Sequence, residues 1–275
     1  MENKCVVPNV IQYGEDGFGH QLEGIMGVLG LHFSGKINYV FNYSRRYKYQ
    51  HSNVDEKCIH YMKDAIEKLL IKYPSTKEFN NRKHKHEVWK IPKNFDENVV
   101  YSIDNAFFEP TEQLVQSQEI FKEIYRENPF LPTPSYQKNV NNEKVVVCHV
   151  RLGDAVGRQQ ELQIQYKVIS YYQENFPDYK IIIHTNGNVP FEEKNNIIIK
   201  NKNTHVLQVL SDFIHADILI IAESSLSIAA TWLCDEKTEI IGPSYNSYNL
   251  KNRIRPGFIS YKDVFNSKIT TTTIV

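Results

Sequence analysis

The second half of the chain alternates short runs of β-branched residues with helical patterns, and this alternation constrains the fold more than any other feature. The runs lie at 145–150, 180–184, 196–200, 217–222 and 239–241. Helical periodicity separates them at 163–175, 204–215 and 225–234. Continuous apolar strands connected through helices are typical of a parallel sheet that is covered on both faces. We therefore predict an α/β fold.

The first half carries a weaker version of the same pattern. We expect strands at 9–13 and 37–41, helices at 20–32, 54–72 and 111–127, and a polar loop at 73–97. Pro129, Pro132 and Pro134 precede an Asn-rich turn, which predicts a domain boundary near 128–143. A chain of 275 residues is long enough for two domains, which we expect at 1–140 and 141–275.

Composition excludes several classes of protein. Lys plus Arg and Asp plus Glu each number 32, so the net charge is zero, which disfavours a general nucleic-acid binder. The longest apolar run, 218–222, is too short to cross a bilayer, and the N-terminus lacks the pattern of a secretory signal. The four cysteines are far apart and predict reduced thiols. We therefore expect a cytoplasmic protein with no membrane span and no nucleic-acid partner.

The residues that follow the predicted strands are candidates for a binding site, because ligands of an open parallel sheet bind beyond the carboxyl ends of its strands. After 145–150, 180–184 and 217–222 come Arg151-Leu-Gly-Asp154, Thr185-Asn186 and Ser224-Ser225. An arginine supplies bidentate positive charge and a helix N-terminus supplies free amides, which together suit a pyrophosphate. The alternatives are a surface turn at Arg151 and a simple helix N-cap at the serines.

The segment His149-Val-Arg151-Leu-Gly153-Asp154 is similar to the His-x-Arg-x-Gly-Asp signature of the GDP-fucose-dependent glycosyltransferases, which include α-1,2-, α-1,6- and protein O-fucosyltransferases. Gly17-Phe-Gly19-His-Gln21 resembles the Gly-x-Gly-Asn-Gln motif of the α-1,2 family, and 224–233 resembles its terminal Ser-Ser-Phe-Ser…Trp-Leu block. The likeness covers about 145–242 and 12–24. It is absent from about 35–140, where acceptor contacts would lie.

This resemblance implies a GT-B fold, in which two Rossmann-like domains have a cleft between them. It assigns 1–140 to the acceptor side and 141–275 to the donor nucleotide, with Arg151 on the β-phosphate of the donor. The further donor-binding residues that it implies are Gly17, Phe18, Gly19, His20, His149, Gly153, Thr185, Asn186, Ser224 and Ser225. Several relatives carry a second arginine where this chain has Leu152.

The catalytic base is the least determined residue. An inverting transfer needs a group that takes the proton of the acceptor hydroxyl. Asp16 precedes Gly-Phe, where an acid serves as base in the protein O-fucosyltransferases that the chain resembles. The alternatives are Asp154, His20 and Glu23, or a solvated turn carboxylate at Asp16.

Metal and acceptor sites are the remaining expectations. No Asp-x-Asp occurs in the sequence, so we expect no metal and no cofactor beyond the nucleotide sugar. Lysines flank His84 and His86, which favours a solvated basic loop over a metal site. Tyr43, Arg45, Arg46 and Tyr47 interleave aromatic rings with cations, as acceptor sites for sugars do, although a packed surface loop would look the same.

The expected function is therefore an inverting, metal-independent glycosyltransferase that moves a sugar, most readily L-fucose from GDP-fucose, to a glycan hydroxyl. Two alternatives stay open at this stage. The same fold could use another donor, such as a UDP-pentose (xylose), or the chain could bind a carbohydrate or nucleotide without turning it over.

Overall fold

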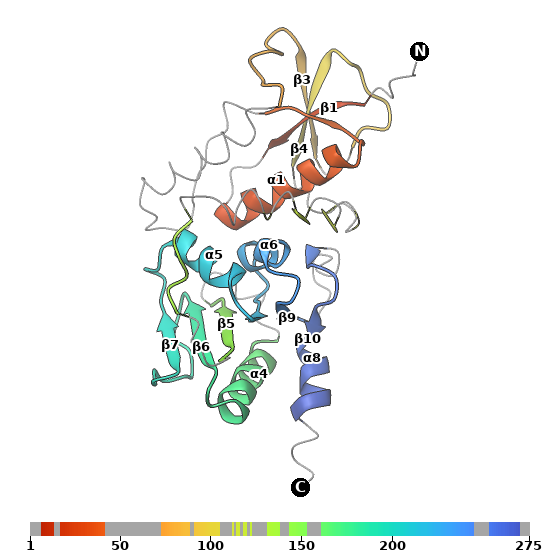
Figure 1. The fold of residues 1–275 in the computed structure, drawn as a ribbon. Helices are drawn as coiled ribbons and strands as arrows, with labels where there is room; N and C mark the ends of the chain where they lie inside the picture. Colours follow the sequence, from red (N-terminus) through yellow and green to blue (C-terminus); the bar gives the residue numbers. More distant parts are fainter. Residues whose placement is uncertain are drawn as a thin grey trace. The chain divides into compact units, whose positions relative to one another are not determined.

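The computed structural model describes residues 7–13, 17–41, 73–88, 91–104, 112, 114–115, 118–119, 122, 131–137, 143–152, 161–244 and 253–269. The chain divides into two compact units, unit 1 at Met1–Phe130 and unit 2 at Leu131–Val275. Figure 1 gives the element labels that are used from here on.

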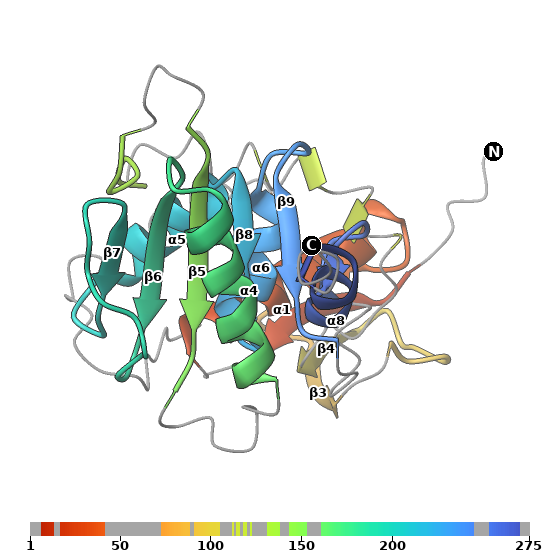
Figure 2. The ribbon, with the colours of Figure 1, turned by 90° about the horizontal axis from the view of Figure 1, so that it is seen from below.

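Unit 2 contains a six-stranded sheet in the order β10-β9-β8-β5-β6-β7, with every pair of neighbours parallel. The strands are β5 (Val145–Val150), β6 (Lys180–Thr185), β7 (Ile197–Lys200), β8 (Ile218–Ile220), β9 (Glu239–Gly242) and β10 (Ile259–Ser260). The helices are α4 (Leu162–Asn175), α5 (Val206–Ile214), α6 (Ser225–Leu233) and α8 (Tyr261–Val264), and a π-helical turn, η4 (Phe265–Ile269), follows. Figure 2 shows α4 on one face of the sheet and α5 and α6 on the other. The predicted parallel α/β architecture is confirmed.

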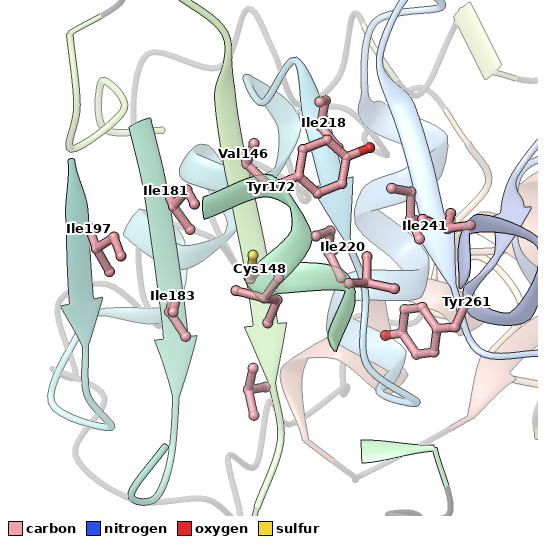
Figure 3. Close-up of a cluster of buried hydrophobic side chains, with 14 residues drawn as sticks. Val146, Cys148, Tyr172, Ile181, Ile183, Ile197, Ile218, Ile220, Ile241 and Tyr261 are labelled. Carbon is pink, nitrogen blue, oxygen red and sulfur yellow. The ribbon is translucent and has the colours of Figure 1, made fainter. Parts of the chain in front are cut away.

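One hydrophobic cluster of unit 2 lies between the sheet and α4, and residues of the opposite face, such as Val147 of β5 and Phe213 of α5, are just as buried. Val146, Cys148 and Val150 of β5 pack in this cluster with Tyr172 of α4, and neighbouring strands add the isoleucines that Figure 3 labels. These side chains are almost fully excluded from solvent. Side chains alternate between the faces of a strand, so the odd-numbered positions of β5 face α5 and α6 instead. That second face carries the polar groups of the candidate site.

Unit 1 contains a four-stranded parallel sheet in the order β2-β1-β4-β3. The strands are β1 (Asn9–Tyr13), β2 (Asn38–Tyr39), β3 (Lys83–Val88) and β4 (Val99–Asp104), and α1 (Phe18–Phe33) follows β1. A Cβ at Gly24 of α1 would lie 2.3 Å from Nε2 of Gln12. Glycine at this position therefore lets α1 approach β1 closely, with the Gln12 side chain between them.

The prediction of a polar loop at 73–97 is wrong, because β3 lies within it. The side chains of Lys83, His84, Lys85 and His86 are all exposed, so this edge strand has none of the apolar alternation that marks a half-buried strand. Strand β4 was not predicted either. The predicted helix at 54–72 lies outside the described residues, whereas the described residues of 111–127 are helical, as predicted.

Among the described residues, no helix combines the length and the apolar character that a membrane crossing requires.

Candidate functional site

The carboxyl ends of β5 and β6 lie side by side in the sheet. Val150 pairs with Thr185, so Arg151 and Asn186 are the first residues beyond the two strands. The backbone N–H of Leu152 donates to Oδ1 of Asn186 over 2.5 Å, which ties the loop after β5 to the loop after β6.

The Leu152 side chain packs closely against the second of these loops. A Cβ at Gly187 would lie 3.0 Å from Cβ of Leu152, so glycine is what allows the two loops to come this near. The hydroxyl of Thr185 is used within its own loop, because it donates to the carbonyl oxygen of Gly187 over 3.0 Å. The predicted nucleoside contacts at Thr185 and Asn186 thus fall on residues whose side chains shape these loops.

The N-terminus of α6 lies next to Arg151. Ser224 occupies the N-cap position in an extended conformation, but its side chain makes no capping hydrogen bond. Its Oγ instead accepts a hydrogen bond from Nη1 of Arg151 over 3.1 Å. An N-cap serine ordinarily accepts from an amide of the first helical turn. The simple N-cap interpretation of the serine pair is therefore wrong for the Ser224 hydroxyl.

This arrangement concentrates positive charge at one point of the sheet edge. The N-terminus of α6 carries the positive end of the helix dipole and the backbone amides of the first turn. Arg151 adds a guanidinium directly beside them, and Ser224 is only 4% exposed. A guanidinium beside a helix N-terminus is suited to hold a phosphate group or another anion.

His149 lies near the end of β5, two residues before Arg151. Its ring packs on that of Phe213 in α5, with 5.2 Å between the centroids, and its carbonyl oxygen accepts from Nε2 of Gln165 over 2.9 Å. Burial, aided by the charges of Arg151 and His184, lowers the pKa of His149 to about 3. His149 is therefore a neutral imidazole at pH 7, and the positive charge at this end of β5 belongs to Arg151.

Asp212 of α5, a buried acid, is hydrogen-bonded to the neighbouring strand β6. His184 of β6 pairs with His149 in the sheet, and its Nε2 donates to Oδ2 of Asp212 in α5 over 2.9 Å. Asp212 also accepts from the backbone N–H and from Oγ of Ser135, over 2.6 and 2.5 Å. This network fixes the end of β6, α5 and the segment 131–137 to one another.

Arg253 is a residue of this site that the sequence analysis missed. It is 9% exposed, and its Nη2 donates to Oγ of Ser225 over 3.1 Å. Its carbonyl oxygen accepts from Nε1 of Trp232 over 2.6 Å, which fixes its backbone against α6. Arg253 follows no predicted strand, and the sequence alone does not show which residues its side chain contacts. Its burial, which the structure alone reveals, is what requires polar partners for its guanidinium.

The predicted donor-site residues of unit 1 lie at the start of α1. Gly17 is the N-cap, with φ −56°, and the helix begins at Phe18. Gly19 and His20 therefore lie in the first helical turn and not in a glycine loop. Phe18 and Gly19 are buried.

Several predicted site residues lie outside the described residues. They are the candidate bases Asp16 and Asp154, the signature residue Gly153, and the acceptor candidates Tyr43, Arg45, Arg46 and Tyr47. Within the part of the chain that the structure describes, no group of three or more His, Cys, Asp or Glu side chains could hold a metal ion.

Comparison with known proteins gives matches among solved structures alone. No family model matches the chain, and no curated protein matches it. The chain is similar to NodZ α-1,6-fucosyltransferase co-crystallised with GDP, with 12% identity and a TM-score of 0.45 over 83% of this chain and 93% of that one.

Two further structures illustrate the range of this similarity. A variant of Arabidopsis thaliana FUT1 in complex with GDP has 9% identity and a TM-score of 0.41, over 88% of this chain and 71% of that one. A family 9 glycosyl transferase from Veillonella parvula has 10% identity and a TM-score of 0.43, over 98% and 90%. Identities and TM-scores this low leave the function to be argued from the motif and from the geometry of the site.

Proposed function

We propose that this chain is an inverting, metal-independent glycosyltransferase that transfers a sugar, with L-fucose from GDP-fucose as the first candidate, to a carbohydrate hydroxyl. The observation that carries the proposal is the contact of Arg151 with Ser224 at the N-terminus of α6. It joins two of the three segments that resemble the GDP-fucose-dependent enzymes, although 73 residues separate them in the chain. The similar solved structures bound to GDP are consistent with it.

The chemistry of a nucleotide sugar suits this arrangement. When the bond between C1 of the sugar and the diphosphate breaks, the bonding electrons go to the diphosphate, whose negative charge grows. A preorganised guanidinium and helix amides stabilise that charge in the transition state. The acceptor oxygen forms the new bond to C1 and loses its proton to a base, for which Asp16 is our first candidate and Asp154 the second.

We also propose a separate role for each of the two units. We propose that the chain is a GT-B enzyme in which unit 2 binds the donor and unit 1 provides the acceptor side, including Tyr43, Arg45, Arg46 and Tyr47. His149 contributes as a neutral, half-buried side chain close to Arg151. Its low pKa makes it a poor proton acceptor at neutral pH, so we assign it to shaping the end of β5.

A donor screen tests the proposal. The purified chain is titrated calorimetrically with GDP, UDP, ADP and dTDP, and nucleotide release from GDP-fucose, UDP-xylose and other nucleotide sugars is then measured with a panel of glycans. We expect GDP to bind and GDP-fucose to be turned over. Turnover of UDP-xylose alone would replace the donor while keeping the enzyme class. Tight nucleotide binding without release across the panel would favour a non-catalytic binding protein.

A further inference from the structure

A buried pair of ionisable side chains lies next to the carboxyl end of β6, and no step of the proposed reaction uses it. Asp212 of α5 and His184 of β6 are 0% and 3% exposed, and 2.9 Å separate Oδ2 of Asp212 from Nε2 of His184. Burying a carboxylate is costly unless donors meet its charge. Ser135 and Gln208 supply the other donors, so the hydrogen bonds of this carboxylate lie within the fold.

The only proton on the His184 ring is directed at Asp212. The Nδ1 atom of His184 is buried and has no hydrogen-bond partner among the described residues. A protonated ring would place a buried N–H there without an acceptor, which is costly. Burial also lowers the pKa of His184, and the Asp212 carboxylate opposes this only in part. The ring is therefore neutral, and the hydrogen bond from Nε2 sets its orientation.

The pair contacts both of the strands whose ends form the candidate site. His184 pairs with His149 of β5 in the sheet. The two imidazole rings pack on one side chain, Phe213, with centroid distances of 5.5 Å for His184 and 5.2 Å for His149. Phe213 follows Asp212 directly in α5. One turn of α5 thus holds β6 by a hydrogen bond and both strands by ring packing.

The contacts of the site begin two residues beyond these histidines. Asn186 accepts the backbone N–H of Leu152 over 2.5 Å, and Arg151 donates to Oγ of Ser224 over 3.1 Å. Hydrogen bonds weaken steeply as distance and angle depart from their optimum. Both contacts therefore depend on the positions in which the ends of β5 and β6 are held.

We propose that Asp212 and His184 are a positioning pair, which holds the carboxyl ends of β5 and β6 in place for the nucleotide sugar without touching it. This inference rests on the function proposed above. A binding site keeps its geometry when supporting side chains lock the residues that contact the ligand. Ser135 bonds to the same carboxylate, but it belongs to the segment 131–137 and to no strand of the sheet. Its hydroxyl should therefore matter for stability alone.

The test compares His184→Leu with Ser135→Ala in the full-length chain. Each removes one hydrogen bond to Oδ2 of Asp212, and only the first lies on a strand of the site. Hydrogen exchange of the Leu152 amide is followed by NMR, which needs no ligand, and GDP affinity is measured by calorimetry. Both measurements use conditions in which urea titrations show the variants to be folded.

We expect His184→Leu to speed exchange at Leu152 and to weaken GDP, each about tenfold, because a charge-assisted hydrogen bond no longer holds the end of β6. Ser135→Ala should lower the free energy of unfolding and leave both quantities within about twofold. His184→Gln keeps an N–H donor on a side chain of similar reach, so it should restore both. Asp212→Asn, which removes the charge and keeps the shape, should act like His184→Leu and takes its place if that variant does not fold.

The outcomes separate this inference from the function on which it rests. If the folded His184→Leu and Asp212→Asn variants match the wild type in Leu152 exchange and in GDP affinity, the positioning role is overturned and the proposed function stands. If Ser135→Ala changes both quantities as much as His184→Leu does, the effect is a general loosening of unit 2 and the role is again overturned. If exchange rises as expected but the wild type binds no nucleoside diphosphate, the pair holds the strand ends and the nucleotide-sugar function falls.

Discussion

Replacing Asp212 by alanine should destabilise unit 2 more than any surface substitution. The Asp212 side chain is fully excluded from solvent, and its carboxylate accepts hydrogen bonds from Ser135, His184 and Gln208. Burial by itself would raise the pKa of Asp212, but the hydrogen bonds from His184 and Ser135 outweigh burial and lower it. The group is therefore an ionised carboxylate in the folded protein at neutral pH.

The expected loss follows from the donors that the substitution leaves behind. Hydrogen bonds to a charged group contribute about 1.5–3 kcal/mol each, and they are not additive within one network. After Asp212→Ala, Nε2 of the buried His184 and the backbone N–H of Ser135 lose their acceptor. We expect the free energy of unfolding to fall by about 3–5 kcal/mol, as for other buried polar networks that lose their central charge.

Urea unfolding followed by circular dichroism measures this loss, with Asp235→Ala as the control. Asp235 is an exposed acid whose carboxylate accepts from the backbone N–H of Lys237, so its loss should cost about 0.5 kcal/mol. Asp212→Asn should lie between the two, because the amide keeps one acceptor but turns a donor toward the others. A fall below about 1 kcal/mol for Asp212→Ala would show that the network contributes no net stability and would refute the argument.

Four further predictions concern the site and its pH dependence. Arg151→Ala should lower turnover about 10²–10³-fold in a folded protein, since it removes the charge that meets the leaving diphosphate; steady-state kinetics would contradict this if over half the activity remained. Asp16→Asn should lower kcat about 10²–10⁴-fold with nearly unchanged GDP affinity, and loss at Asp154→Asn instead would transfer the role of base. Activity should persist in excess EDTA, and full loss restored by one divalent ion would overturn metal independence. The free energy of unfolding should fall as the pH drops from about 6.5 toward 3, because the histidine is protonated in the unfolded chain over this range while His149 in the folded protein stays neutral. Urea titrations at several pH values should show a weaker pH dependence of this free energy for His149→Gln.

The central strands of unit 2 were predictable because they are buried on both faces, whereas the short edge strand β10 was not predicted. A run such as Val145–Val150 has one interpretation when helical periodicity follows it, and strand β5 has these bounds. Strand β3 shows the opposite case. Its exposed lysines and histidines carry no apolar signal, and only its backbone pairing with β4 makes it a strand. An edge strand made of exposed polar residues, as β3 is, gives a search for apolar periodicity nothing to detect.

The part of the site that lies directly beyond the carboxyl ends of the strands was predictable from the sequence. The rule about strand ends identifies Arg151 and Ser224 separately, and the fold confirms that they touch. It cannot identify Arg253, which ends no strand and reaches Ser225 across 28 residues of chain. Nor could it assign the side chains of Asn186 and Thr185, since their bonding depends on how two loops pack.

Strand β3 also bears on how the protein behaves in concentrated solution. It lies at the end of its sheet, with β4 as its only strand neighbour among the described residues, and an open sheet edge is a template on which another chain can add a strand. The exposed Lys83 and Lys85 place like charges along that edge, so a second copy approaching in register meets electrostatic repulsion. Lysines on an edge strand are a common device against such pairing, so the polar residues that give β3 no apolar pattern also disfavour the addition of a further strand.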